Sequence, residues 1–164
     1  MLNGKLWFKS TEGQGFSFSF TIPNSTEKQE KIQHTEEVKI AFNRKNLKIL
    51  IAEDDESSLV YLSILVKQFG NEILTVRSGL EAVETCLEHP DIDLILMDIR
   101  MPVMNGYEAT RQIRKFNTGV IIIAKTAFAL SGDYQMAIDA GCNKYISKPI
   151  QKDKLQLLIT KIFN

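Results

Sequence analysis

The sequence is short of cysteine and of long apolar runs. Only two cysteines, Cys86 and Cys142, occur among 164 residues, and their wide separation gives neither a metal-ligand spacing nor a disulfide framework. The longest apolar runs, such as the one at residues 120–124, are far too short to span a bilayer, and no signal peptide opens the chain. We therefore expect a soluble, cytoplasmic chain whose cysteines are small buried groups in a reducing compartment.

An excess of either charge is also missing. Lysine and arginine number 20, as do aspartate and glutamate, so the formal net charge is zero. A neutral chain has no bulk attraction to nucleic acid or to an anionic membrane, and we expect neither as a partner. What remains is an ordinary soluble mixture with 44% apolar and 24% charged residues, long enough for one domain and an appendage.

Three segments of the chain differ in pattern. Residues 5–22, KLWFKSTEGQGFSFSFTI, contain two strand-like runs joined at EGQG, which predicts a β-hairpin. An isolated hairpin is marginally stable, so it should belong to a larger sheet or pack on something else. Residues 23–46 open with proline and turn formers and then mix charges of both signs, which predicts a linker, partly helical around residues 32–42.

From Leu47 onward, short apolar runs alternate with segments of helical periodicity. Five strands alternating with five helices predict a parallel sheet with helices on both faces, because parallel strands need crossover connections. The near-continuous apolar character of the strands agrees, since strands covered on both faces are apolar throughout. The predicted strands are LKILIA (47–52), EILTV (72–76), DLILM (93–97), GVIIIA (119–124) and KYIS (144–147).

Polar side chains collect where the predicted strands end. Ligands of a doubly wound sheet bind outside the carboxyl ends of the strands, so these side chains should converge on one edge. Each alone has an ordinary interpretation as a helix cap, a turn former or a solvated group. Their coincidence at the same end of successive strands favours a shared site instead. The set comprises Glu53, Asp54, Asp55, Asp98, Thr126 and Lys148.

A cluster of carboxylates at that edge needs a cation. Two like unit charges about 4 Å apart repel by ~4 kcal/mol at an effective dielectric constant of about 20. Few hard oxygen ligands, with positions left for water and phosphate oxygens, suit Mg²⁺, with Mn²⁺ as the alternative. Carboxylates, Mg²⁺, a hydroxyl and a lysine together suit phosphoryl transfer. Asp98 is the natural nucleophile, because aspartyl phosphates are known covalent intermediates.

Four ordered motifs resemble those of the response-regulator receiver domain. KILIAEDD resembles the first strand and acidic pair of that family, and LILMDIRMPVMNGYEA resembles its phosphoacceptor signature. IIIAKTAFA resembles the fourth strand with its hydroxyl, and YISKPI resembles the final aromatic residue and Lys-Pro pair. The resemblance covers residues 47–164 and implies a flavodoxin-like (CheY-like) α/β/α fold with a five-stranded parallel sheet of order 2-1-3-4-5.

The resemblance also implies a set of metal ligands. Asp98 is similar to the phosphorylated aspartate of the family and Asp54 to the acid that binds Mg²⁺ directly. Glu53 is similar to the second acid, which acts largely through water. The backbone carbonyl of Arg100, two residues after Asp98, would be the third protein ligand.

The remaining motif residues imply a conformational switch. Thr126 is similar to the hydroxyl that shifts toward the phosphoryl group, Lys148 to the lysine that contacts it, and Tyr145 to the switch aromatic. The bond between Lys148 and Pro149 is expected to be cis. Lys125 departs from the family, in which an apolar or neutral residue is commoner before the threonine. We expect Lys125 to point to solvent rather than to alter the charge near the site.

The N-terminal stretch NGKLWFKSTEGQGFSFSFTIP resembles the last two strands of a histidine kinase ATPase domain. The chain would then be a fragment of a hybrid sensor kinase, whose parent could be membrane-anchored, with an ATPase hairpin at 1–22, a linker at 23–46 and a receiver at 47–164. Nucleotide-binding motifs are absent, and His34 and His89 lack the context of a phosphodonor and are interpreted as incidental surface residues. The fragment should neither bind ATP nor autophosphorylate.

These patterns predict a phosphorylation-controlled switch. A phosphohistidine, on a histidine kinase core or a histidine phosphotransfer domain, would donate its phosphoryl group to Asp98. Self-phosphotransfer and autodephosphorylation would be the only enzymatic reactions. Two alternatives stay open: a pseudo-receiver that acts only as a docking module and, fitting less well, an Asp-nucleophile phosphatase. The apolar hairpin should pack on the receiver, pair with another copy as a homo-oligomer, or stay disordered.

Overall fold

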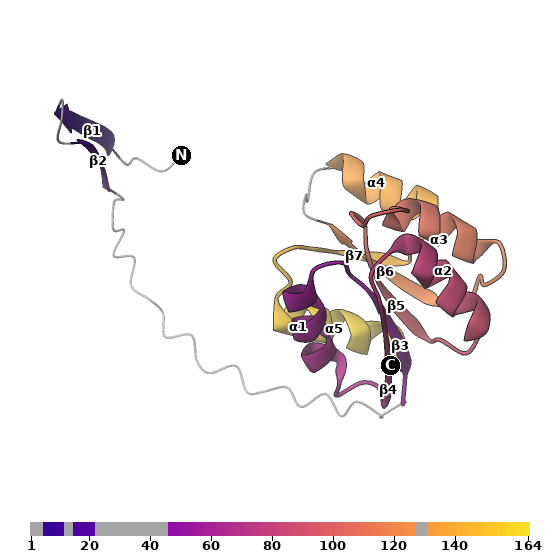
Figure 1. Cartoon of the computed structure of the whole chain (residues 1–164). Coiled ribbons are helices and arrows are strands. Elements are labelled where there is room, and N and C mark those ends of the chain that lie inside the picture. Colours follow the sequence, from indigo (N-terminus) through magenta and orange to yellow (C-terminus); the bar gives the residue numbers. More distant parts are fainter. Residues whose placement is uncertain (1–4, 12–14, 22–45, 127–130) are drawn as a thin grey trace. The chain divides into compact units, whose positions relative to one another are not determined.

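The computed structural model of the chain describes residues 5–11, 15–21, 46–126 and 131–164 (Figure 1). The chain divides into two compact units, residues 1–40 and residues 41–164. His34 and nearly all of the predicted linker, including its helical part, lie outside the described residues. Within the described part of the chain, no helix is long and apolar enough to cross a membrane.

The N-terminal unit contains the predicted hairpin. Strand β1 (Lys5–Thr11) pairs antiparallel with β2 (Gly15–Thr21), and Gly15 enters β2 with φ +90°, a conformation that suits glycine. Phe8 lies opposite Phe18, with ring centroids 6.2 Å apart, and Phe18 meets Phe16 edge-on at 5.5 Å. Alternate residues of a strand share a face, so the hairpin, taken by itself, has one strongly aromatic face.

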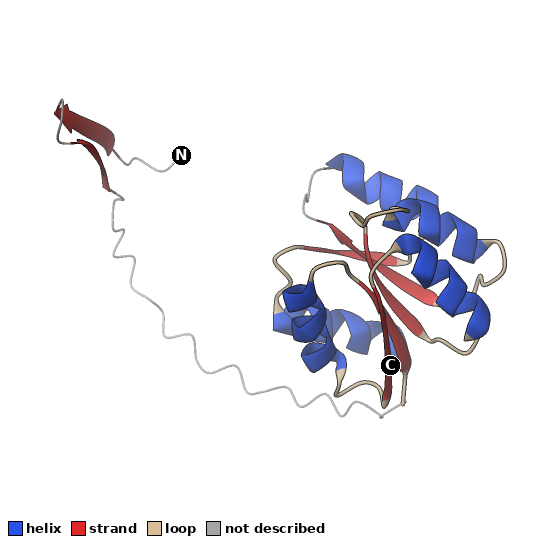
Figure 2. Cartoon of the chain, viewed as in Figure 1, coloured by secondary structure: helices blue, strands red, loops and turns tan. Residues whose placement is uncertain are grey.

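The second unit follows the predicted alternation of strands and helices (Figures 1 and 2). Its strands form one parallel sheet of order β4-β3-β5-β6-β7, which confirms the order 2-1-3-4-5 implied by the resemblance. The elements are β3 (Lys48–Ala52), α1 (Glu56–Val66), β4 (Glu72–Val76), α2 (Gly79–Glu88), β5 (Leu94–Asp98), α3 (Gly106–Arg114), β6 (Ile121–Thr126), α4 (Ser131–Ala140), β7 (Lys144–Ser147) and α5 (Lys152–Phe163).

Both faces of this sheet are covered by helices. One apolar core joins the sheet to α2, α3 and α4, and a second joins it to α1 and α5 (Figure 2). Side chains along each strand alternate between the two cores, so that Ile95 and Met97 of β5 face the first, and Leu94 and Leu96 face the second. All five residues of β5 are buried. The apolar run of this strand therefore follows from cover on both faces.

The turns at the carboxyl ends of the strands are fixed by helix caps. Asp55 caps α1, where its carboxylate accepts a hydrogen bond from the Ser58 backbone N–H at 2.8 Å, so this acid of the predicted set serves as a cap. Asn105 caps α3 in the same way. Gly106 comes so close to β5 that a Cβ there would lie 2.1 Å from the Asp98 carbonyl oxygen. The β5–α3 turn is therefore held tightly against the end of β5.

Candidate functional site

Three carboxylates meet at the carboxyl ends of the two central strands. Glu53 and Asp54 follow β3, and Asp98 ends the neighbouring strand β5. One carboxylate oxygen from each of the three lies within 4.8 Å of the others. Glu53 and Asp98 are buried, at 1% and 4% exposure, whereas Asp54 is exposed. We call this set the acid site, and it brings together three of the four acids that the sequence singled out, the fourth being the cap residue Asp55.

Lys148 bridges the two buried acids. Its Nζ atom lies 2.5 Å from Asp98 Oδ2 and 3.2 Å and 3.1 Å from the two carboxylate oxygens of Glu53. The Lys148 backbone N–H donates to the Thr126 carbonyl oxygen at 2.7 Å, which ties the segment after β7 to the end of β6. The Lys148–Pro149 bond is cis, as expected. A charge-assisted bridge of this kind lets two acids lie side by side in a buried position.

Lys125 does not point to solvent, and that expectation is wrong. Its side chain is fully buried, and its ammonium group lies 2.9 Å from Glu53 Oε2 and 3.0 Å from the Ala52 carbonyl oxygen. The reason is the alternation of β6, because Ile123 and Lys125 share the face that α1 and α5 cover. Asp98 pairs with Lys125 across the β5–β6 ladder, so the lysine reaches past Asp98 to Glu53.

The position of Lys125 could have been found from the sequence. A strand that is apolar throughout is covered on both faces, so a lysine next to its end has no solvent face to point to. Counting in steps of two from Ile123 places Lys125 on the same face as the buried acids. The residue type alone suggested a solvated group, and the strand phase was the stronger indicator.

The pKa values of the two buried acids shift in opposite directions. Burial raises the pKa of Asp98; the hydrogen bond from Lys148 opposes the rise and the charge of Glu53 adds to it. Burial would also raise the pKa of Glu53, but the charge and hydrogen bond of Lys125 hold that pKa below its usual value. Burial lowers the pKa of Lys148, yet its contacts with Asp98 keep that pKa above the usual value. For Lys125, burial outweighs the pull of Glu53 and lowers the pKa.

The chemistry of the acid site fits a small, hard divalent cation. Mg²⁺ prefers carboxylate and carbonyl oxygens and keeps several waters, and an exposed Asp54 beside two buried acids leaves room for them. The Arg100 backbone N–H lies 3.3 Å from Asp98 Oδ1, so the turn after β5 stays beside the acid site. The predicted role of the Arg100 carbonyl as a metal ligand stays a prediction.

The predicted switch residues lie on the two neighbouring strands. Thr126 ends β6 and is buried at the same edge of the sheet as the acid site. Tyr145 lies on β7, is 40% exposed, and packs edge-on against Tyr134 of α4, with ring centroids 5.2 Å apart. Their roles in switching stay predictions. His89, interpreted as an incidental surface group, is half-buried, and its Nδ1 atom lies 3.2 Å from Lys48 Nζ.

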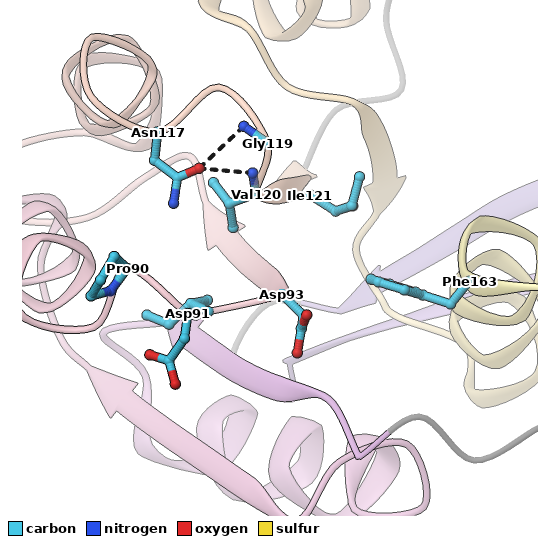
Figure 3. A pocket seen from close by; sticks show the side chains of 9 residues that line it. Pro90, Asp91, Asp93, Asn117, Gly119, Val120, Ile121 and Phe163 are labelled. Atoms are coloured by element: carbon cyan, nitrogen blue, oxygen red, sulfur yellow. Dashed lines mark hydrogen bonds between the residues drawn. The ribbon is translucent and has the colours of Figure 1, made fainter.

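Two pockets lie at opposite ends of the sheet's strands, one at the carboxyl ends and one at the amino ends. A pocket of about 410 Å³ borders the acid site and includes Tyr61, Leu62 and Ile150. Another, of about 320 Å³, lies among the segments that precede β5 and β6 (Figure 3). There the Asn117 side chain accepts hydrogen bonds from the backbone N–H groups of residues 119 and 120, and Figure 3 shows no lysine among the lining residues. Of these two pockets, the first is therefore the one that borders the acid site.

The fold and the acid site together define a receiver domain of two-component signalling. A family model of the response regulator receiver domain matches residues 49–160, and the chain belongs to this family. The polar-differentiation response regulator DivK of Brucella ovis is 40% identical over 104 residues, which is 62% of this chain and 84% of that protein.

Solved structures show the same relationship. The receiver domain of a sensor histidine kinase from Pseudomonas aeruginosa, which holds magnesium in its active-site cleft, is 36% identical with a TM-score of 0.63, and the match covers 73% of this chain and 98% of that one. The receiver domain in a Saccharomyces cerevisiae complex with a histidine phosphotransfer protein is 30% identical with a TM-score of 0.67, and the match covers 72% and 89%.

Proposed function

We propose that residues 47–164 are a phosphoacceptor receiver domain in which Asp98 accepts a phosphoryl group from phosphohistidine in a Mg²⁺-dependent reaction. The observation that carries the proposal is the buried Asp98 carboxylate at the sheet edge, bridged by Lys148 to Glu53 and within reach of Asp54. Support comes also from the magnesium that the Pseudomonas aeruginosa receiver domain holds in its cleft.

The proposed reaction is an in-line displacement at phosphorus. A carboxylate oxygen of Asp98 forms the new P–O bond as the P–N bond to histidine breaks, and the electron pair of that bond stays on the imidazole nitrogen. Lys148 neutralises the phosphoryl oxygens through its ammonium group. A bound Mg²⁺, held by Asp54 and Asp98 with Glu53 acting through water, would supply further charge neutralisation. Arg100 would add its backbone carbonyl to this ligand set.

The proposed response is a shift between two conformations. The phosphoryl group adds a charge of about −1.5 to −2 beside Asp98, which draws the Thr126 hydroxyl and Lys148 toward it. Tyr145 then reorients against α4, and the surface made by α4 and β7 changes shape. The 40% exposure of Tyr145 and its edge-on ring contact with Tyr134 of α4 support this role.

A surface on α1 supports a helical protein as the phosphodonor. Val60, Tyr61 and Ile64 recur at helical spacing and are 49%, 43% and 67% exposed. This α1 patch continues into the pocket of Tyr61, Leu62 and Ile150 beside Lys148. An apolar patch next to a phosphotransfer site suits a partner that must hold its histidine over Asp98, as a kinase core or a histidine phosphotransfer domain would.

The wider setting of the chain is also part of the proposal. We infer a cytoplasmic hybrid sensor kinase, in which residues 1–22 are the final hairpin of an ATPase domain, 23–46 are a linker and 47–164 relay the phosphoryl group onward. The hairpin pairing of β1 and β2 and its aromatic face support this reading, because such a face normally packs on the rest of a larger unit.

The proposed function is tested with a small phosphodonor. The full chain is incubated with acetyl phosphate and Mg²⁺ and examined by intact mass spectrometry, and we expect a single phosphate adduct that Asp98→Asn abolishes. Asp153→Asn, the same change at an exposed acid in the first turn of α5, is the matched control and should keep the adduct. An adduct that persists in Asp98→Asn contradicts the assignment.

The same experiment separates the alternatives. A docking-only pseudo-receiver would form no adduct and would bind no Mg²⁺. An Asp-nucleophile phosphatase would turn over small phosphoesters many times, whereas a receiver domain would carry at most one phosphoryl group per chain, on Asp98.

A further inference from the structure

Beside the acid site lies a second lysine, Lys125, which is fully buried and which the proposed reaction does not use. Lys148 is 30% exposed along its side chain, whereas Lys125 is 0% exposed. A fully buried lysine is rare and is held in place only by close partners, here Glu53 and the Ala52 carbonyl oxygen. Lys125 is therefore enclosed by the protein, whereas Lys148 is partly open to solvent.

Lys125 contacts Glu53, one of the three carboxylates of the acid site. Lys125 Nζ lies 2.9 Å from Glu53 Oε2, and Lys148 Nζ lies 3.1 Å from that same oxygen. Glu53 thus meets two ammonium groups, while Asp98 meets one. The carboxylate expected to act on the metal through water is already oriented and neutralised by the protein.

The second lysine changes the charge that a divalent ion would meet. Three carboxylates and one lysine would leave two negative charges, whereas the two lysines of this chain leave one. Coulomb interactions over about 5 Å are strong even at an effective dielectric constant of about 20, so one extra positive charge should weaken binding of Mg²⁺ roughly tenfold or more.

We propose that Lys125 is a built-in counter-ion of the acid site, which positions Glu53 and lowers the affinity of the site for Mg²⁺. The inference rests on the proposed function, because it concerns the same acids. Lys125 acts through Glu53 and is a positioning residue rather than a catalytic one. The acid site then stays assembled at low Mg²⁺, and phosphorylation requires more Mg²⁺ than the same three acids would without this lysine.

The test measures Mg²⁺ binding to the full chain by isothermal titration calorimetry. Lys125→Met keeps the length of the side chain and removes its charge, and we expect it to bind Mg²⁺ about tenfold more tightly than the unmodified chain. Lys144→Met makes the same change at an exposed lysine on β7 and should bind within about twofold of the unmodified chain. Equal or weaker binding by folded Lys125→Met overturns the proposal.

Thermal unfolding with and without Mg²⁺ tests the proposal even if Lys125→Met folds poorly. Without Mg²⁺, Lys125→Met should unfold at a lower temperature than the unmodified chain, because the carboxylates have lost a counter-charge. Added Mg²⁺ should replace that charge and restore most of the difference in unfolding temperature. Lys125→Gln, whose amide still donates a hydrogen bond, should behave alike. If both variants stay unfolded in millimolar Mg²⁺, the lysine has a purely structural role and the proposal is wrong.

The outcomes also separate this inference from the proposed function. An unmodified chain that neither binds Mg²⁺ nor forms the Asp98 adduct contradicts both. A chain that binds Mg²⁺ and forms the adduct, with unchanged Mg²⁺ affinity in Lys125→Met and Lys125→Gln, contradicts only the role of Lys125.

Discussion

Glu53 and Asp98 are buried side by side, yet their pKa values move in opposite directions. Burial alone would raise the pKa of both carboxyl groups. Lys125 and Lys148 both form ion pairs with Glu53, whereas Asp98 pairs with Lys148 and feels the charge of Lys125 only weakly. The positions of the two ammonium groups therefore give the two carboxyl groups opposite pKa shifts. The two lysines favour the anionic form of Glu53, whereas burial favours the neutral form of Asp98, the proposed nucleophile.

A buried thiol gives a prediction at the same scale. Burial raises the pKa of Cys86 from 9.0 to about 11. Since the thiolate is the reactive form, two units of pKa reduce its population roughly a hundredfold at any pH below both values. In a Cys142→Ala chain, which isolates Cys86, an aromatic disulfide reagent at pH 8 should react at least about a hundredfold faster after unfolding in urea. A native rate within tenfold of the unfolded rate would count against this burial.

At the scale of elements, the β5–α3 turn decides where Asp98 stands. The Gly106 backbone N–H donates to the Ile99 carbonyl oxygen at 3.0 Å, and the Asn105 side chain caps α3. The helix therefore begins directly against the end of the strand. A tight turn of this kind would hold Asp98 still, as the proposed phosphoryl transfer to this residue requires, because positioning supplies much of the rate of such a reaction.

Gly106→Ala tests that tight turn. A Cβ at this position would lie 2.1 Å from the Asp98 carbonyl oxygen, so the turn must shift. We expect a loss of about 1–3 kcal/mol in the free energy of unfolding in urea, together with slower adduct formation from acetyl phosphate. Gly119→Ala is the matched control, because its Cβ would meet only the Asn117 side-chain oxygen at 3.9 Å. Equal stability of the two variants would show that the turn has room to spare.

How far the sequence predicts these elements depends on pattern and phase. The strand order came from the resemblance, because alternation predicts a parallel sheet without ordering it. Asp98 and Lys148 were found because strand ends converge, and the structure brings them together. Asp55 proved to be a helix cap, which an acidic run cannot distinguish from a ligand. The residue type of Lys125 predicts a solvated side chain, whereas its position in the strand alternation places it in the core.

At the scale of the whole molecule, the two units differ in what they contain for folding alone. The second unit has two apolar cores and a satisfied charged cluster at one edge, and among its described residues no buried side-chain polar atom lacks a partner. It contains what a separately folding domain needs. The hairpin is a two-stranded ribbon with an aromatic face, and such a ribbon is marginal alone.

Removal of the first unit tests what the aromatic face does. We predict that residues 1–164 self-associate with rising concentration in multi-angle light scattering, because apolar strands with unpaired edges seek partners, whereas residues 47–164 stay monomeric. The urea midpoint of the second unit should be the same in both chains. If both chains are monomers at every concentration, association through the hairpin is excluded.

Trapping the acyl phosphate tests most directly whether Asp98 carries the phosphoryl group. After incubation with acetyl phosphate and Mg²⁺, reduction with borohydride converts a phosphorylated aspartate to homoserine, which peptide mass spectrometry then locates. We predict homoserine at position 98 alone, dependent on Mg²⁺ and absent without the donor. Homoserine at another acid, or a phosphate adduct with no reduction at position 98, would contradict the account.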